Sequence, residues 1–533
     1  MAQNPDLDIY YMSEWTWMRQ RAREYWDWYS GHRLDEMPGS QIDPDTGKPS
    51  KRYPLGLNPI AKACRIHQAV MIGSLDEYDV PPIQVTYHPE QDDEKSHQEA
   101  HALQNIIRRT WECSDGAALQ LEAALLEQIN GGHVFKVAFE PDNLMLPYRI
   151  RYVGLRAEWL YPIYDVTNPW VLKEAYLGYM IPAKIAEDYY GIDPHLQREV
   201  LYMEHWTPDL CIIRVDGIVP ELEGKRLEFE HKWGVVPIVY IPHTREHGVG
   251  DLAFETDREF WGRSLVPSLT GLTEEKNARA TDWGDAVDAA THPELVGVNI
   301  RQQPQSIPLE VDASGNILKS IIVLGNEQAA PNAPKIRAEY VTPPSISKDV
   351  LGYNSYLWSE ICKQADIAPV TIGDDDVSGG RITGPVTAYR MFPTTSHTQG
   401  ERIEFSSGMA HLARIALQII RINQKAGVYK ELKIDLPEIT EEMVNRRAGT
   451  RWKPQIPIDK TELVTQLSAR LSAGGISLET YLEEIGERDV PAEMRRIWAD
   501  RERQAEIEIK VAKASKPAPT GGNSGSSSDG ASA

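Results

Sequence analysis

Apolar residues recur at helical spacing in several N-terminal segments of this 533-residue chain. Between Ser13 and Ser30, aromatic residues and methionine alternate with charged residues, which predicts an amphipathic helix that ends before Gly31. Three further helices are predicted, over 58–75, over 97–111 with Ser96 as the N-cap, and over 117–130 with Gly131 as the C-cap.

The spacing of apolar residues then changes to the period of two that is typical of strands. It begins with residues 133–139 and continues in several stretches between 149 and 241. One short helix is predicted within this region, at 182–190. The first 250 residues are therefore predicted to have an α+β fold.

Helical spacing returns over 255–290, where we expect Pro267 to kink or restart the helix and Pro293 to end it. The following residues, 294–341, have the pattern of a compact, strand-rich insert. A second helix is predicted after the insert, with Ser345 as its N-cap. Because one helix leads into the insert and another leads out, we expect an antiparallel helix pair with a small domain at its tip.

The segment from Ile367 to Gly384 contains three consecutive aspartates and a pair of glycines, so it cannot continue a helix. Pro385 fits the start of the next helix, which we expect to be interrupted at Pro393 and Gly400. Beyond the interruption, one helical face with a polar end is predicted from Phe405, Met409, Leu412, Ala416, Ile419 and Asn423. A long loop held between two long helices is commonly a functional device.

The C-terminal part is predicted to be helical from 440 to 509, with helices at 460–472 and 477–485 on either side of Gly474 and Gly475. Residues 510–533 are predicted to be a disordered tail, because they are mostly Pro, Gly, Ser and Ala.

Composition and charge limit the possible classes of protein. A chain of this length predicts two to four modules. The formal net charge of −22 argues against a protein that wraps DNA, which needs a basic surface. The four cysteines form no CxxC pair, so they fit a reducing compartment and provide no metal framework. The N-terminus does not resemble a signal peptide, and no apolar run reaches the roughly 18–20 residues of a membrane span. We expect a soluble, intracellular chain.

One short motif has the letters of a zinc site. Residues 243–247, His-Thr-Arg-Glu-His, match the HxxEH pattern of inverted zinc proteases. That chemistry needs a helix, which places both imidazoles on one face. Because Pro242 precedes the motif and Gly248 follows it, a loop is favoured over a zinc site.

The glycine-rich segment 379–384 could in principle bind phosphate through backbone amides. It lacks the Gly-Lys-Ser/Thr ending of a P-loop, and the aspartates at 374–376 would repel a nucleotide, so a flexible hinge is favoured. The same aspartates are adjacent loop residues, which rarely converge on one atom, so a solvated charge run is favoured over a carboxylate site. No catalytic residue, cofactor site or metal ligand is predicted, and nothing in the sequence demands an enzyme.

The order of these parts resembles the portal proteins of tailed double-stranded-DNA bacteriophages. The resemblance covers about 450 residues and rests on a series of short fragments in the family's order. These fragments are Tyr29–His32, Asn58–Lys62, Asn130–Lys136, Gly262–Ser264 with Leu272, Asn277 and Thr281, Pro293–Val296, Ile367–Pro369, Ser378–Gly379, Leu471–Thr480 and Glu493–Trp498.

The resemblance implies a portal fold within the α+β class. Its expected parts are an N-terminal wing at 1–254, a first stem helix at 255–292, a clip at 293–344, a second stem helix at 345–366, a tunnel loop with long helices at 367–439, a helical crown at 440–509 and the tail at 510–533.

The same resemblance implies a structural ring, typically of twelve copies, at one vertex of the virion capsid. The ring would be assembled in the host cytoplasm and would conduct double-stranded DNA during packaging and ejection. The implied partners are the terminase large subunit, a head-completion or tail connector protein, and the capsid and scaffolding proteins.

Two sets of site residues follow from the resemblance. The tunnel loop would present Asp374, Asp375, Asp376, Ser378, Gly379, Gly380, Arg381 and Thr383 to the DNA. The clip would dock the motor or tail through Arg301, Gln302, Glu310, Asp312, Lys319 and Glu327. We hypothesise that Arg381 touches passing phosphates while the three aspartates keep that contact transient, because tight phosphate contacts would oppose movement.

Two alternatives remain. A carbohydrate-active enzyme or another hydrolase would have paired carboxylates in a concave site and a small oligomeric state. A tail or baseplate adaptor would also form a ring, but it would lack the loop between paired helices.

Overall fold

The computed structural model describes most of the chain as mixed helix and strand. The described residues are 5–35, 56–73, 81–91, 93–165, 167–193, 198–222, 224–244, 260–291, 295–298, 305–311, 317–323, 337–340, 348–372, 384–455, 460–487 and 490–514. The chain divides into two compact units, residues 1–456 and residues 457–533, and each is described by itself.

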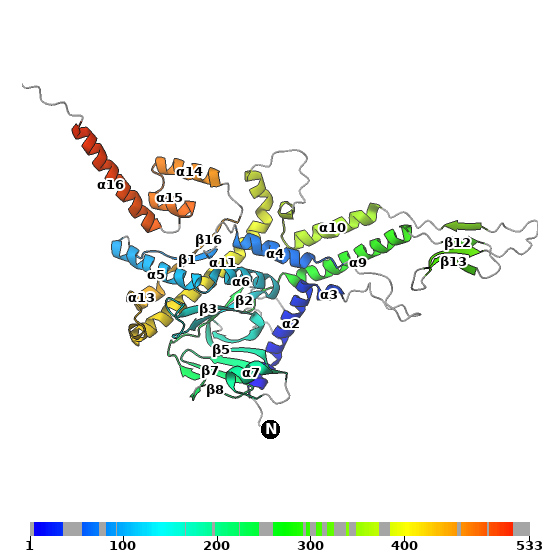
Figure 1. The fold of residues 1–533 in the computed structure, drawn as a ribbon, viewed down its shortest axis with the longest axis horizontal. Coiled ribbons are helices and arrows are strands. Elements are labelled where there is room, and N and C mark those ends of the chain that lie inside the picture. The colour runs from blue at the N-terminus through cyan, green and yellow to red at the C-terminus, as the bar shows by residue number, and fades with distance from the viewer. Residues whose placement is uncertain are drawn as a thin grey trace, which may run out of the picture. The chain divides into compact units, whose positions relative to one another are not determined.

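The first unit begins with helices that surround a sheet (Figure 1). They are α1 (Pro5–Tyr10), α2 (Ser13–Ser30), α3 (His32–Asp35), α4 (Pro59–Ile72), α5 (Glu94–Glu112) and α6 (Gly116–Asn130). The predicted helices at 13–30, 58–75 and 117–130 are confirmed. Gly31 and Gly131 end α2 and α6 in the left-handed conformation, with φ of 89° and 80°, which glycine adopts without steric cost.

The predicted N-cap of α5 is wrong. The cap is Asp93, whose side chain accepts a hydrogen bond from the Ser96 backbone N–H at 2.6 Å. The Ser96 hydroxyl instead accepts from the backbone N–H of Glu90 at 2.9 Å, so it fixes the turn before the helix. Aspartate and serine are comparable caps, and the sequence offered both within four residues.

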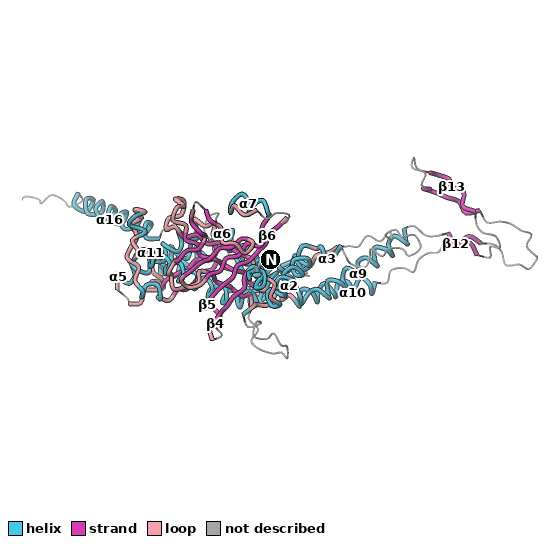
Figure 2. The backbone as a smooth tube through the Cα atoms, turned by 90° about the horizontal axis from the view of Figure 1, so that it is seen from below, coloured by secondary structure: helices cyan, strands magenta, loops and turns pink. Residues whose placement is uncertain are grey.

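The two largest sheets of the first unit are antiparallel, and their strands lie where the period-two pattern predicted them (Figure 2). The three-stranded sheet has the order β11 (Ile238–Pro242), β2 (Gly132–Phe139) and β3 (Ile150–Leu155). The five-stranded sheet has the order β10 (Glu228–Glu230), β7 (Leu210–Val215), β6 (Glu199–Trp206), β5 (Asn168–Pro182) and β4 (Leu160–Asp165). The short helix α7 (Ala183–Tyr190) follows β5, a 3-10 turn (Ala157–Trp159) precedes β4, and β8 (Glu221–Leu222) pairs with β9 (Lys225–Arg226).

Two long helices follow, and they lie side by side in both views (Figures 1 and 2). Helix α9 (Val266–Thr291) begins at Val266 rather than near 255, because residues 262–265 are not helical. Pro267 therefore lies in its first turn, where a missing N–H costs nothing, and the predicted restart is confirmed. Helix α10 (Lys348–Gln364) is the second of the pair; the predicted N-cap, Ser345, lies outside the described residues.

Between α9 and α10 the chain forms the predicted strands. They are β12 (Leu295–Val298), β13 (Gln305–Val311), β14 (Ile317–Val323) and β15 (Arg337–Tyr340). Strand β12 pairs with β15, and β13 pairs with β14, both antiparallel.

Helix α11 (Gly384–Lys425) follows a 3-10 turn (Pro369–Ile372) and runs without interruption for 42 residues. The predicted interruption at Pro393 and Gly400 is therefore wrong. Proline removes one intrahelical hydrogen bond, but buried residues that follow it, including Thr394 and Thr398, hold the helix in place. The predicted apolar face is confirmed, since Phe405, Met409, Leu412, Ala416 and Ile419 are all fully buried in the core.

The first unit ends with α12 (Val428–Glu431), α13 (Glu441–Asn445) and β16 (Ala448–Trp452). Strand β16 was not predicted; it pairs with β1 (Ile83–Tyr87), more than 350 residues earlier in the chain. In the second unit, α14 (Lys460–Ser472) and α15 (Leu478–Ile485) confirm the two predicted helices around Gly474 and Gly475. Helix α16 (Val490–Ala514) extends into the predicted tail.

Candidate functional site

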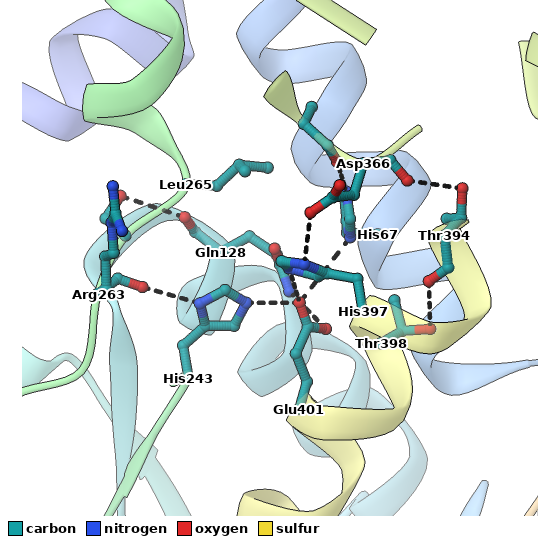
Figure 3. A network of polar contacts seen from close by, with 12 residues as sticks. His67, Gln128, His243, Arg263, Leu265, Asp366, Thr394, His397, Thr398 and Glu401 are labelled. Carbon is teal, nitrogen blue, oxygen red and sulfur yellow. Dashed lines mark hydrogen bonds and ion pairs between the residues drawn. The ribbon is translucent and has the colours of Figure 1, made fainter. Parts of the chain in front are cut away.

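A cluster of polar side chains is buried where α4, β11 and α11 meet in the first unit (Figure 3). Its centre is Glu401 of α11, which is 2 % exposed. Three imidazoles surround its carboxylate: His67 of α4, His243 just after β11, and His397 one turn earlier on α11. We call these four residues the His–Glu cluster.

Helix α11 supplies two members of the cluster because His397 and Glu401 are four residues apart and so face the same side. The Nε2 atom of His397 lies 3.0 Å from Glu401 Oε1. On its other side, His397 Nδ1 lies 3.0 Å from Asp366 Oδ2. Both ring nitrogens of His397 therefore face carboxylates.

His67 reaches the cluster from α4, whose N-terminus is capped by Asn58 through the Ala61 N–H at 3.0 Å. His67 Nε2 lies 2.6 Å from the carbonyl oxygen of Ala365. A carbonyl only accepts hydrogen bonds, so this nitrogen carries the proton of the neutral ring. The other nitrogen, Nδ1, faces Glu401 Oε1 at 3.8 Å and has no hydrogen-bond partner.

His243 is positioned by the end of β11, where its backbone N–H donates to the carbonyl of Gly131 at 2.9 Å. Its Nδ1 lies 2.8 Å from the carbonyl oxygen of Arg263, and its Nε2 lies 2.6 Å from Glu401 Oε1. The second oxygen of Glu401 accepts a hydrogen bond from Gln128 Nε2 at 3.1 Å. Both carboxylate oxygens are therefore paired.

Residues 262–265, which are not helical, connect this cluster to the start of α9. The Leu265 N–H donates to the Gln128 carbonyl at 3.0 Å, and the Ser264 hydroxyl donates to the Ile129 carbonyl at 2.6 Å. These contacts satisfy carbonyls at the C-terminal end of α6 that have no partner within the helix. The start of α9 is thus fixed against α6.

The end of α10 is fixed in a similar way, by a threonine of α11. Thr394 Oγ1 donates to the Asp366 carbonyl at 2.8 Å and accepts from the Ala368 N–H at 2.8 Å. Together with the His67 contact to Ala365, these bonds attach the residues after α10 to α4 and α11. The His–Glu cluster therefore lies beside the residues where α9 begins and α10 ends.

Burial and charge determine how the cluster is protonated. Burial would raise the pKa of Glu401, but the contacts with His243 and His397 outweigh burial and hold this pKa well below its ordinary value. The hydrogen bond to Glu401 raises the pKa of His397. Burial lowers the pKa of His67. These shifts favour the ionised form of Glu401, the protonated form of His397 and the neutral form of His67.

The geometry allows two chemical roles. As a hydrogen-bonded network, the cluster joins α4, α11 and the segments that enter α9 and leave α10. As a ligand set, His67, His397 and Glu401 each offer one atom, and these atoms lie within 4.8 Å of one another. The cluster contains no activated nucleophile.

The predicted tunnel-loop residues lie outside the described residues; they are Asp374, Asp375, Asp376, Ser378, Gly379, Gly380, Arg381 and Thr383. The same holds for four predicted clip residues, Arg301, Gln302, Asp312 and Glu327. The other two, Glu310 and Lys319, are directly opposite each other in the β13–β14 pair.

Sequence analysis missed most of the His–Glu cluster. Of the HxxEH motif, His243 and Thr244 are not helical, as expected, while residues 245–247 lie outside the described residues. His243 nevertheless joins histidines from other elements. The available signal was the four-residue spacing of His397 and Glu401, which the predicted interruption at Gly400 concealed.

A scan against models of known protein families and a search of curated proteins found no match to this chain. Among the described residues, no helix combines the length and apolar character that crossing a membrane requires.

Proposed function

We propose that this chain is the subunit of a portal-type ring that conducts double-stranded DNA at one capsid vertex. In this proposal the strand-rich segment between α9 and α10 docks the terminase motor and later the tail connector. The chain acts as a structural part of the virion and has no catalytic role.

The observation that best supports the proposal is the α9–α10 pair. Lys276 Nζ of α9 donates to Asn354 Oδ1 of α10 at 2.9 Å. Nearer the start of α9 and the end of α10, Leu269 packs in one apolar cluster with Ile361. The contacts therefore run antiparallel, and the β12–β15 pairing continues the same direction. A helix pair that encloses a strand-rich segment is the arrangement expected of a portal stem and clip.

Helix α11, which follows the predicted tunnel loop in the chain, also supports the proposal. Its C-terminal half is buried in the core, whereas its N-terminal half exposes large apolar side chains, including Tyr389, Phe392 and Ile403. Exposed apolar residues of this size suit contacts between copies of a chain. The net charge of −22 per chain also suits a channel that must release DNA phosphates readily.

The test is the native mass of the untagged protein, measured by light scattering, with negative-stain images of the same fraction. We expect rings with an axial hole and a mass of about 720 kDa, twelve times the chain mass of 60.1 kDa. Because some rings form only with a scaffold, the measurement is repeated with the scaffolding protein from the same genome.

A monomer or dimer in both experiments would contradict the proposal. The enzyme alternative would then be tested by a screen for glycoside hydrolysis. A ring that never associates with the terminase large subunit would favour the adaptor alternative over the portal.

A further inference from the structure

The His–Glu cluster contains one contact that its own hydrogen bonds do not explain. His67 Nδ1 is completely buried, has no hydrogen-bond partner and faces Glu401 Oε1 at 3.8 Å. The ring proton is on Nε2, which points at the Ala365 carbonyl. A nitrogen lone pair therefore faces an ionised carboxylate with no proton between them. Two acceptors facing each other in a buried site are unfavourable, and a cation between them would remove the cost.

The groups that contact the outward-facing ring nitrogens of His67 and His397 are those expected around a metal site. A metal-binding histidine usually donates its second ring N–H to a carbonyl or a carboxylate, which fixes the tautomer and the ring orientation. His67 has the Ala365 carbonyl at 2.6 Å in this role, and His397 has Asp366 Oδ2 at 3.0 Å. Their inner nitrogens, Nδ1 and Nε2, both point at Glu401 (Figure 3).

We propose that His67 Nδ1, His397 Nε2 and the Glu401 carboxylate bind one divalent transition-metal ion, with Zn²⁺ as the ion that fits best. Two imidazoles and a carboxylate are a familiar zinc ligand set, whereas Mg²⁺ and Ca²⁺ prefer oxygen ligands.

The two distances from Glu401 Oε1 to the histidine nitrogens suit this ion. Zinc bonds of 2.0–2.1 Å in a tetrahedral arrangement place neighbouring donor atoms roughly 3.3 Å apart. Glu401 Oε1 lies 3.0 Å from His397 Nε2 and 3.8 Å from His67 Nδ1, on either side of that value. His243 and Gln128 contact the Glu401 oxygens and position the carboxylate.

The role of the ion is structural, because the ligands join α4 to α11 and their outer partners belong to the residues that follow α10. Binding the ion would fix the end of α10, and with it the α9–α10 pair, on the core of the first unit. All of the ligands come from one chain, so the proposal does not depend on ring formation and can fail separately from it.

The experiment uses full-length, untagged protein that has been treated with a chelator and dialysed. Zinc uptake is measured by elemental analysis, and the coordination is measured from the visible spectrum after Co²⁺ is added. We expect one equivalent of zinc per chain, a cobalt spectrum that Zn²⁺ abolishes, no effect of Mg²⁺ on that spectrum and a higher unfolding temperature with zinc.

Two variants and a matched control assign the ligands. His67→Gln and Glu401→Gln should each lose the bound equivalent and the cobalt spectrum, while His101→Gln, a substitution of an exposed histidine on α5, should keep both. If a variant does not fold, the wild-type titrations decide. A folded wild-type protein that takes up no zinc and gives no cobalt spectrum would show that the cluster is a hydrogen-bonded network only. Variants that retain the spectrum would place any ion elsewhere.

Discussion

Lys136 Nζ lies 2.9 Å from Glu204 Oε1 and 3.0 Å from Glu204 Oε2, and this ion pair joins the two largest sheets of the first unit. Lys136 belongs to β2 of the three-stranded sheet, and Glu204 belongs to β6 of the five-stranded sheet. Glu204 is 5 % exposed and also accepts hydrogen bonds from the Tyr202 hydroxyl at 2.9 Å and from Trp206 Nε1 at 2.6 Å. A buried pair of this kind is costly to break from one side.

The first prediction is that Glu204→Gln lowers the free energy of unfolding by about 3–5 kcal/mol, because Lys136 then keeps a largely buried charge without its partner. Urea unfolding followed by tryptophan fluorescence measures this loss. The double substitution Lys136→Met with Glu204→Gln should recover part of it. If the loss in the free energy of unfolding of the double variant equals the sum of the losses of Lys136→Met and Glu204→Gln, the two residues do not interact.

The second prediction concerns the pH dependence of this pair. Burial opposes ionisation of Glu204, but Lys136 together with the hydrogen bonds from Trp206 and Tyr202 outweighs burial and holds the pKa of Glu204 below its ordinary value of 4.5. The unfolded state then binds the proton more readily, so the contribution of Glu204 to stability is complete above about pH 4.5 and is lost as the pH falls through the folded pKa. The stability difference between wild type and Glu204→Gln should therefore be largest at neutral pH and should shrink in acid. A difference that does not change with pH would contradict the assignment.

The third prediction is that Gly262→Ala strongly destabilises the first unit. A Cβ at residue 262 would lie 2.1 Å from the carbonyl oxygen of Gly131, and a backbone atom cannot move aside as a side chain can. We expect a loss of at least about 3 kcal/mol, measured by urea unfolding. The control is Gly271→Ala on α9, where a Cβ would meet no atom within 4 Å and should stabilise the helix by up to about 1 kcal/mol. Equal effects at the two glycines would contradict the close crossing at residue 262.

These elements also show what the sequence could and could not predict. Local signals were sufficient for α2, α6 and α14, because glycine caps and apolar periodicity depend only on neighbouring residues. The pairing of β16 with β1 depends on residues more than 350 positions apart, so no local pattern could predict it. The His–Glu cluster could not be predicted for the same reason, since its members come from α4, the end of β11 and α11. Only the His397–Glu401 pair was visible in the sequence, and the predicted interruption at Gly400, which lies between the two residues, concealed it.

The fourth prediction is that one cysteine per chain reacts rapidly with a thiol reagent in the native protein. Cys113 is exposed, whereas Cys64, Cys211 and Cys362 are buried. Burial also raises the pKa of Cys64 to about 12, so little of it is the reactive thiolate at neutral pH. Alkylation followed by peptide mass analysis should find modification at Cys113, and at all four positions after denaturation. Rapid modification of Cys64 in the native protein would contradict the packing of α4.

The fifth prediction tests the proposed DNA-facing role of residues 374–381. Replacing Asp374, Asp375 and Asp376 with lysine adds three cations a few positions before Arg381 in the sequence, which should lengthen each contact with passing phosphates and slow packaging. Packaged DNA is measured over time in proheads that contain the variant ring. The matched control replaces the same three residues with asparagine, which removes the repulsion without adding positive charge and should have a smaller effect.

Salt gives an independent check of the electrostatic explanation. Phosphate contacts weaken as the salt concentration rises, because releasing counterions from DNA into a saltier solution gains less entropy. The lysine variant should therefore regain packaging rate at higher salt more than the wild type does. A lysine variant that forms rings and packages at the wild-type rate would show that these residues do not meet the DNA. A slow variant that salt does not rescue would point instead to a contact with a neighbouring subunit.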